Sequence, residues 1–154
     1  MTNTEISEKQ REGLNKITHE IIAAAIRVHS HLGPGLLENA YQACLEHEFR
    51  LRGMDFKSQV YLPVEYKGVK VKLGYKLDLL VEDLVIVEIK ACAGIDPLFK
   101  AQLLSYLRLS NKEIGLLINF HNHKLTEGVV RVVNGYPKDV VPSQAKDELR
   151  HLSG

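Results

Sequence analysis

The chain has 154 residues, of which 45% are hydrophobic and 25% charged, a balance typical of a globular domain and not of a disordered chain. Lys and Arg number 20 against 19 Asp and Glu, so bulk charge does not indicate a polyanion-binding protein. Apolar runs are far shorter than a membrane span of roughly 18 residues, the N-terminus lacks a signal segment, and the two cysteines cannot form a disulfide framework. We expect a cytoplasmic protein without a membrane partner, with a flexible lead-in at 1–13 and a single domain at 14–154.

The first part of the chain has the residue spacing of two helices. Apolar residues recur every three or four positions from Leu14 to Leu32, and the sequence Gly-Pro-Gly at 33–35 ends this helix. A second helix is predicted from Leu36 to Leu51. Its expected apolar face consists of Leu37, Tyr41, Cys44, Leu45 and Phe49.

The middle of the chain changes to the alternating pattern of strands. Strands are predicted around 60–64, 69–73, 75–81 and 84–91, as a meander of three or four strands. A helix should follow from Asp96-Pro97 to about Asn111, with apolar positions at Leu98, Ala101, Leu104, Leu107 and Leu109. Further strands are predicted at 115–120 and 129–133, and a short polar helix at 144–152. This order predicts an α/β (α+β) fold in which helices pack against a sheet.

Three ionisable residues lie inside these apolar strands. Asp78 belongs to one strand, whereas Glu88 and Lys90 belong to the next and share one face because strand side chains alternate. Such charges are costly to bury unless they pair or bind a metal. Two carboxylates suit Mg²⁺ or Mn²⁺, and a neighbouring lysine could orient or deprotonate an attacking water or neutralise phosphate charge. The alternative is a salt bridge on a solvent-facing strand.

The turn between the two strands decides whether Asp78 and Glu88 can meet. A two-residue turn at 82–83 would place them on opposite faces, whereas a three-residue loop pairs Val81 with Val85 and sets Asp78 opposite Glu88. We therefore predict the odd loop or an equivalent bulge. The same register gathers four apolar side chains on a common face: Leu77, Leu79, Val87 and Ile89.

Asp78 comes first along the chain, followed by Glu88-Ile89-Lys90 and then by a helix that carries Gln102 and Tyr106. The order of these residues resembles the PD-(D/E)XK nuclease superfamily, especially its RecB-like branch. That branch has a D…ExK core followed by a helix with Q-x-x-x-Y. Leu77 stands where the name of the superfamily has proline, a position known to vary.

A second motif points to a narrower group within this superfamily. Residues 35–41, Gly-Leu-Leu-Glu-Asn-Ala-Tyr, match the signature of the GxxExxY proteins, and the similarity runs from Ile17 through Val133. The resemblance implies a restriction-endonuclease-like αβββαβ core, with a central mixed sheet flanked by helices.

The resemblance also implies roles for individual residues. Asp78, Glu88 and the main-chain carbonyl of Ile89 would hold the metal, and Lys90 would serve the attacking water. Glu38 resembles the extra acidic residue that many members contribute from the first core helix. The alternative for Glu38 is a glutamate favoured in the first turn by the helix dipole.

Other residues offer possible contacts with a substrate. Gln102 and Tyr106 lie four positions apart on one helix face and could contact substrate or support Lys90; the alternative is that they form the polar edge of a core-facing helix. Five lysines between Asp55 and Lys76 could hold phosphates or could merely protect an exposed sheet edge. They are Lys57, Lys67, Lys70, Lys72 and Lys76.

Together these features predict a nuclease that uses Mg²⁺ or Mn²⁺ to hydrolyse phosphodiester bonds, with DNA as the expected substrate. A metal-activated water would attack phosphorus in line. The main alternative is a binding or regulatory module that retains the nuclease fold, and a purely structural subunit is a third. A homodimer or a larger nucleic-acid-processing partner is compatible with any of these. Metal affinity discriminates between an active site and an inert module.

Overall fold

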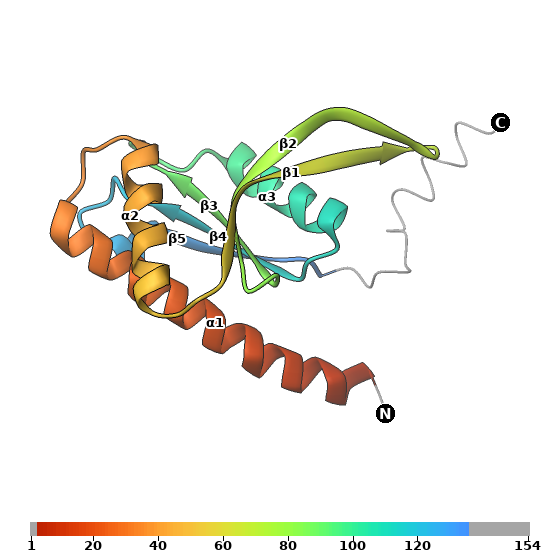
Figure 1. Cartoon of the computed structure of the whole chain (residues 1–154), viewed down its shortest axis with the longest axis horizontal. Helices are drawn as coiled ribbons and strands as arrows, with labels where there is room; N and C mark the ends of the chain where they lie inside the picture. Colours follow the sequence, from red (N-terminus) through yellow and green to blue (C-terminus); the bar gives the residue numbers. More distant parts are fainter. Residues whose placement is uncertain (1–2, 136–154) are drawn as a thin grey trace.

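The structure, a computed structural model, describes residues 3–135. Its elements, shown in Figure 1, are α1 (Asn3–Leu32), α2 (Glu38–Leu51), β1 (Phe56–Tyr66), β2 (Val69–Val81), β3 (Val85–Lys90), α3 (Pro97–Ser110), β4 (Ile114–Asn119), a 3₁₀ turn (Leu125–Gly128) and β5 (Val129–Val133). This order contains the predicted αβββαβ core. The helix predicted at 144–152 lies outside the described residues.

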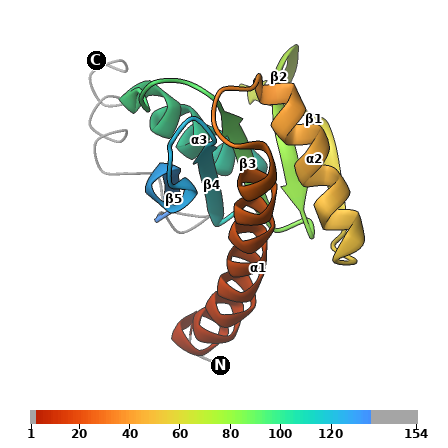
Figure 2. The same cartoon turned by 90° about the vertical axis from the view of Figure 1, so that its left-hand side faces the viewer.

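Helix α1 is longer than its apolar pattern predicts. It begins at Asn3, so residues predicted to be a loose lead-in are helical, and its first turns project beyond the sheet (Figures 1 and 2). From residue 8 onward, where side-chain burial is described, the first buried position is Leu14, which is where the apolar spacing starts. No helix in the described part of the chain is both long enough and apolar enough to cross a bilayer.

Tyr41 fixes the connection between α1 and α2. Its hydroxyl donates a hydrogen bond to the carbonyl of Gly33 and accepts one from the N–H of Leu36, while its buried ring stacks on Phe120 with centroids 4.5 Å apart. Gly33 has a φ of +68°, a conformation that glycine adopts without strain. The tyrosine of the GxxExxY pattern therefore ties the interhelical loop to the core, and the first turn of α2 follows directly.

The predicted apolar face of α2 is only partly correct. Tyr41, Leu45 and Phe49 are buried as expected. Leu37 is 76% exposed; it is the N-cap, with an extended backbone, and so precedes the helical turns whose spacing defines the buried face. Cys44 is also exposed, since it lies outside the stripe formed by residues spaced four apart.

Helix α3 has the predicted ends but a different buried face. The Asp96 carboxylate accepts a hydrogen bond from the N–H of Leu98, and Asn111 ends the helix in the left-handed conformation. The buried residues are Leu103 and Leu107, which lie one turn apart. The predicted stripe combined positions from different faces, and three of its members are exposed: Leu98, Ala101 and Leu109.

The sheet has five strands in the order β1-β2-β3-β4-β5. β3 and β4 are parallel and are joined through α3, whereas the other neighbours are antiparallel, so the sheet is mixed as predicted. The segments predicted at 69–73 and 75–81 form one strand, β2. At Gly74 this strand approaches β1 so closely that a Cβ would lie 2.9 Å from the carbonyl oxygen of Leu62.

Helices cover both faces of the sheet. α1 and α2 lie on one side and α3 on the other (Figure 2). Val87 and Ile89 of β3 pack with α1 and α2, whereas Ile86 packs with α3, so Glu88 and Lys90 belong to the α3 side. All residues of β4 are buried, as predicted for a strand covered on both faces.

Candidate active site

The turn between β2 and β3 has the predicted odd length. Val81 pairs with Val85 across a three-residue loop, 82–84. Glu82 and Asp83 adopt φ values of +52° and +56°, and the N–H of Leu84 donates to the carbonyl of Val81. The register that brings Asp78 to Glu88 is therefore confirmed.

Asp78 and Glu88 are held together by reciprocal hydrogen bonds. Asp78 Oδ2 accepts from the N–H of Ile89 at 2.9 Å, and Glu88 Oε1 accepts from the N–H of Asp78 at 3.2 Å. The regular pairing of β2 with β3 covers 79–81 and 85–87, so these bonds lie where the strands begin to separate. Each carboxylate thus satisfies a backbone donor of the opposite strand, and the two groups are fixed side by side.

Strand β2 is irregular at Asp78, and for this reason the prediction that Leu77 shares a face with Leu79 is wrong. Leu79, Val87 and Ile89 share the cluster against α1 and α2, but Leu77 joins Leu80 in the cluster against α3. The β1–β2 pairing omits Gln59 and Asp78, and Gln59 has a φ of +50°. The alternation of side chains between the two faces of β2 is interrupted at this point. β-Bulges beside active sites change the direction of side chains in the same way.

Gln42 braces the irregular strand, and the sequence reasoning missed it. Its Nε2 donates to the carbonyl of Asp78 at 3.1 Å, and its Oε1 accepts from Nε2 of Gln59 at 3.2 Å. The only signal in the sequence is its position four residues after Glu38, on the same face of α2.

Burial and the neighbouring carboxylate change the acidity of Glu88. Its side chain is buried, with a residue exposure of 8%. Loss of hydration, followed by the charge of Asp78, raises the pKa of Glu88 to about 8, although the Asp78 N–H and the charge of Lys90 act in the opposite direction. The environment of Glu88 in the protein alone therefore favours its protonated form. The alternative of a solvent-facing salt bridge with Lys90 does not agree with this burial.

Lys90 is placed by an aromatic ring and not by an ion pair. Its Nζ lies 4.3 Å from the ring centroid of Phe99, at the start of α3. Among the described residues, no ion pair joins Lys90 to Asp78 or Glu88. The ammonium donors are therefore available to a water or a phosphate oxygen.

Tyr106 lies close to the carboxylates, whereas Gln102 has no described bond to them. Burial and the charges of Glu88, Tyr75 and Asp78 raise the pKa of Tyr106. Its ring centroid is 5.4 Å from that of Tyr75, a residue that the sequence reasoning did not consider. Gln102 is half-buried one turn earlier on α3.

Glu38 is exposed in the first turn of α2, one turn before Gln42. The described residues contain no group of three His, Cys, Asp or Glu side chains arranged to hold a metal, so Glu38 is not gathered with Asp78 and Glu88. That Glu38 and the carbonyl of Ile89 take part in metal binding stays a prediction.

The pair of carboxylates fits a hydrated Mg²⁺ or Mn²⁺. These ions prefer oxygen donors and retain several waters, so one or two carboxylates suffice. Burial and the charge of Asp78 raise the pKa of Glu88, and a divalent cation bound between the two carboxylates would offset the repulsion between them.

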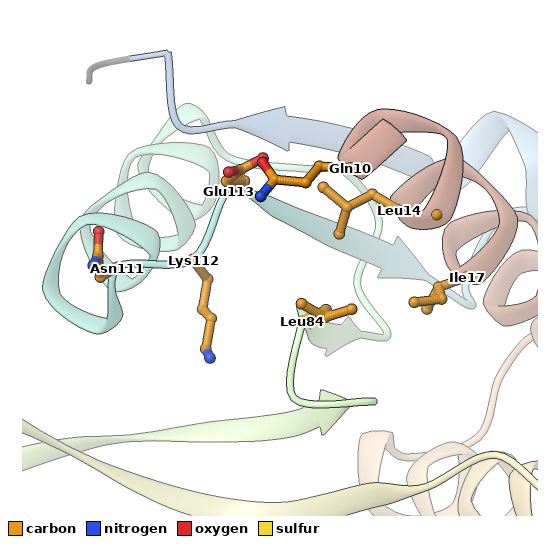
Figure 3. Close-up of a pocket in the computed structure, with 8 residues that line it drawn as sticks. Gln10, Leu14, Ile17, Leu84, Asn111, Lys112 and Glu113 are labelled. Atoms are coloured by element: carbon orange, nitrogen blue, oxygen red, sulfur yellow. The ribbon is translucent and has the colours of Figure 1, made fainter. Parts of the chain in front are cut away.

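The cavity in Figure 3 lies elsewhere. Its volume is about 330 Å³, and it is lined by α1, the β2–β3 loop and the segment before β4. Leu84, one of its lining residues, precedes β3, whereas Lys90 is at the opposite end of that strand. The cavity is therefore separate from the carboxylate site.

Comparison with known proteins identifies a family that covers most of the chain. The sequence model of the PD-(D/E)XK nuclease superfamily matches residues 15–132, which include all the site residues described above. Comparisons with curated proteins and with solved structures gave no match. The chain belongs to the PD-(D/E)XK nuclease superfamily.

Proposed function

We propose that this protein is a metal-dependent nuclease that hydrolyses phosphodiester bonds, with DNA as its substrate. The proposal depends above all on the reciprocal placement of Asp78 and Glu88 at the point where β2 leaves β3. Lys90 stands on the same side of the sheet as Glu88, beside the pair. A RecB-like or GxxExxY affiliation belongs to this proposal, supported by the motifs at Gln102, Tyr106 and 35–41.

Asp78 and Glu88 would hold Mg²⁺ or Mn²⁺, assisted by the carbonyl of Ile89 and by Glu38. The metal, when bound, supplies positive charge that acidifies water and stabilises the phosphate in the transition state. Metal binding requires Glu88 to release its proton, because an ionised carboxylate is the ligand. Affinity for metal therefore rises with pH towards about 8, the pKa of Glu88 in the protein alone.

Lys90 would orient the attacking water and donate to a phosphate oxygen. In an in-line attack, the bond from water oxygen to phosphorus forms as the bond from phosphorus to the leaving oxygen breaks. Phe99 holds the ammonium group in place without neutralising it. Tyr106 and Gln102 would contact the substrate or support Lys90.

Local charge also supports a polyanionic substrate. Four lysines of the β1–β2 region are exposed: Lys57, Lys67, Lys70 and Lys76. The side chain of Lys72 lies outside the described part. Lysines at such positions would make binding dependent on salt.

The alternative proposal is a binding or regulatory module without cleavage, which acts through a homodimer or a larger nucleic-acid-processing partner. The exposed position of Glu38, apart from the two carboxylates, favours it. A cytoplasmic location fits either function and is supported by the free thiols of Cys44 and Cys92.

Cleavage assays separate the two functions. Circular and linear, single- and double-stranded DNA and RNA would be incubated with Mg²⁺, Mn²⁺ or a chelator. We expect metal-dependent products from the wild type, none from Lys90→Ala, and wild-type activity from Lys100→Ala, which removes an exposed lysine of α3. Metal binding without cleavage of any substrate would favour the module, and products that persist in Lys90→Ala would refute the assigned site.

A further inference from the structure

The outer part of β2 carries an aromatic side chain to the catalytic side of the sheet. Only the end of β2 pairs with β3, so β1 and the rest of β2 extend away as a two-stranded ribbon (Figure 1). Tyr75 is paired with Leu62 across this ribbon. Leu62 and Leu77 pack in the cluster against α3, which places Tyr75 on the α3 side as well.

Tyr75 and Tyr106 form an incompletely covered aromatic pair beside the carboxylates. Tyr75 is 51% exposed, and the two rings are tilted by 42° with centroids 5.4 Å apart. A tilted pair does not cover both ring faces, so aromatic surface remains open to solvent. Asp78 lies three residues after Tyr75 on β2, and Tyr106 is near enough to Asp78 and Glu88 to respond to their charges.

We propose that Tyr75 and Tyr106 form a stacking site for an unpaired nucleobase next to the phosphate that is cut. This inference rests on the proposed nuclease function and narrows its substrate to single-stranded or frayed nucleic acid. A base inside a duplex is already stacked between its neighbours and would first have to be extruded. An open tyrosine face offers every base a similar partner, so the site favours single strands without selecting a sequence.

The opposite face of the ribbon provides a matched control. Tyr61 is 67% exposed and pairs with Lys76, whose Nζ lies 4.8 Å from the tyrosine ring centroid. Tyr61 and Tyr75 are thus exposed tyrosines of the same ribbon on different faces. Only Tyr75 contacts Tyr106.

Binding measured without catalysis tests the stacking site directly. The Lys90→Ala protein would be titrated with single-stranded and duplex oligonucleotides that contain 2-aminopurine, recording anisotropy and fluorescence quenching. Tyr75→Ala should weaken single-strand binding about 5- to 150-fold, in accordance with the roughly 1–3 kcal/mol of one base stacked on an aromatic ring, and should abolish quenching. Tyr75→Phe should retain both signals, and Tyr61→Ala should bind like the parent.

Folding is controlled with Tyr75→Leu, which keeps apolar packing against Tyr106 but offers no aromatic face, so it should bind as weakly as Tyr75→Ala. Unchanged single-strand binding in both variants, equal loss in Tyr61→Ala, or absence of single-strand binding in the parent would overturn the stacking site. Cleavage by the wild type with unchanged binding in the Tyr75 variants would refute this inference alone. Stacking without any cleavage by the wild type would refute only the nuclease activity.

Discussion

Replacing Glu88 by glutamine should stabilise the metal-free protein at alkaline pH. An unperturbed glutamate ionises near 4.5, whereas Glu88 in the folded chain keeps its proton until about pH 8. As pH rises through this window the unfolded chain loses its proton first, so the folded state loses stability relative to it. Glutamine keeps the oxygen that accepts the Asp78 N–H but carries no charge.

The interval from 4.5 to about 8 corresponds to at most about 5 kcal/mol, at ~1.4 kcal/mol per pH unit. Because local relaxation and water penetration reduce the penalty of a buried charge, we expect Glu88→Gln to gain about 2–4 kcal/mol at pH 9. The gain should be small at pH 5 and should disappear below about pH 4, where Glu88 is protonated in both the folded and the unfolded chain.

Urea unfolding with a chelator at pH 5, 7 and 9 measures this difference. Glu20→Gln, at an exposed position of α1, controls for removal of a charge and should remain close to wild type at each pH. Equal stability of Glu88→Gln and wild type at pH 9, or a difference that does not change with pH, would refute the assignment of burial and repulsion at this carboxylate. Added Mg²⁺ should stabilise the wild type but not Glu88→Gln.

Three further substitutions test the surroundings of the site. Gln42→Ala removes the amide that supports Asp78 and should weaken Mn²⁺ binding about 10-fold while the chain stays folded; unchanged affinity in calorimetry would contradict this role. Phe99→Leu should lower kcat about two- to fivefold, the effect of losing a cation–π contact of ~0.5–1 kcal/mol, and a change in KM alone would argue against it. Lys57→Gln should reduce the slope of log affinity against log salt by about one, whereas Lys9→Gln on α1 should leave the slope unchanged.

The register of β2 and β3 could be predicted because it depends on local parity. The hydrophobic face of one strand must continue on the next strand of the hairpin. Only a loop with an odd number of residues also places Asp78 opposite Glu88. The strongly apolar β4 was also recognisable, since burial on both faces requires an uninterrupted apolar run. The position of Leu77 could not be predicted, because the irregular residue Gln59 donates its side-chain hydrogen bond to Gln42 of a different element, α2.

The aromatic surroundings of the site depend on tertiary contacts. Tyr75 and Tyr106 are neighbours only because β2 and α3 meet on one side of the sheet. Phe99 lies next to the ammonium group of Lys90 because of the geometry of the connection from β3 to α3, which the sequence pattern does not specify. In α3, several leucines offered more than one apolar stripe, and packing against the sheet selected Leu103 and Leu107.

Mn²⁺ binding at pH 8 tests the Asp78–Glu88 site most directly. Isothermal titration would compare the wild type with Asp78→Asn and Lys90→Ala. If the two carboxylates hold the catalytic metal, the wild type and Lys90→Ala bind with similar affinity, whereas Asp78→Asn loses at least about 10-fold. Absence of binding by the wild type, or undiminished binding by Asp78→Asn, would contradict a metal site at this pair.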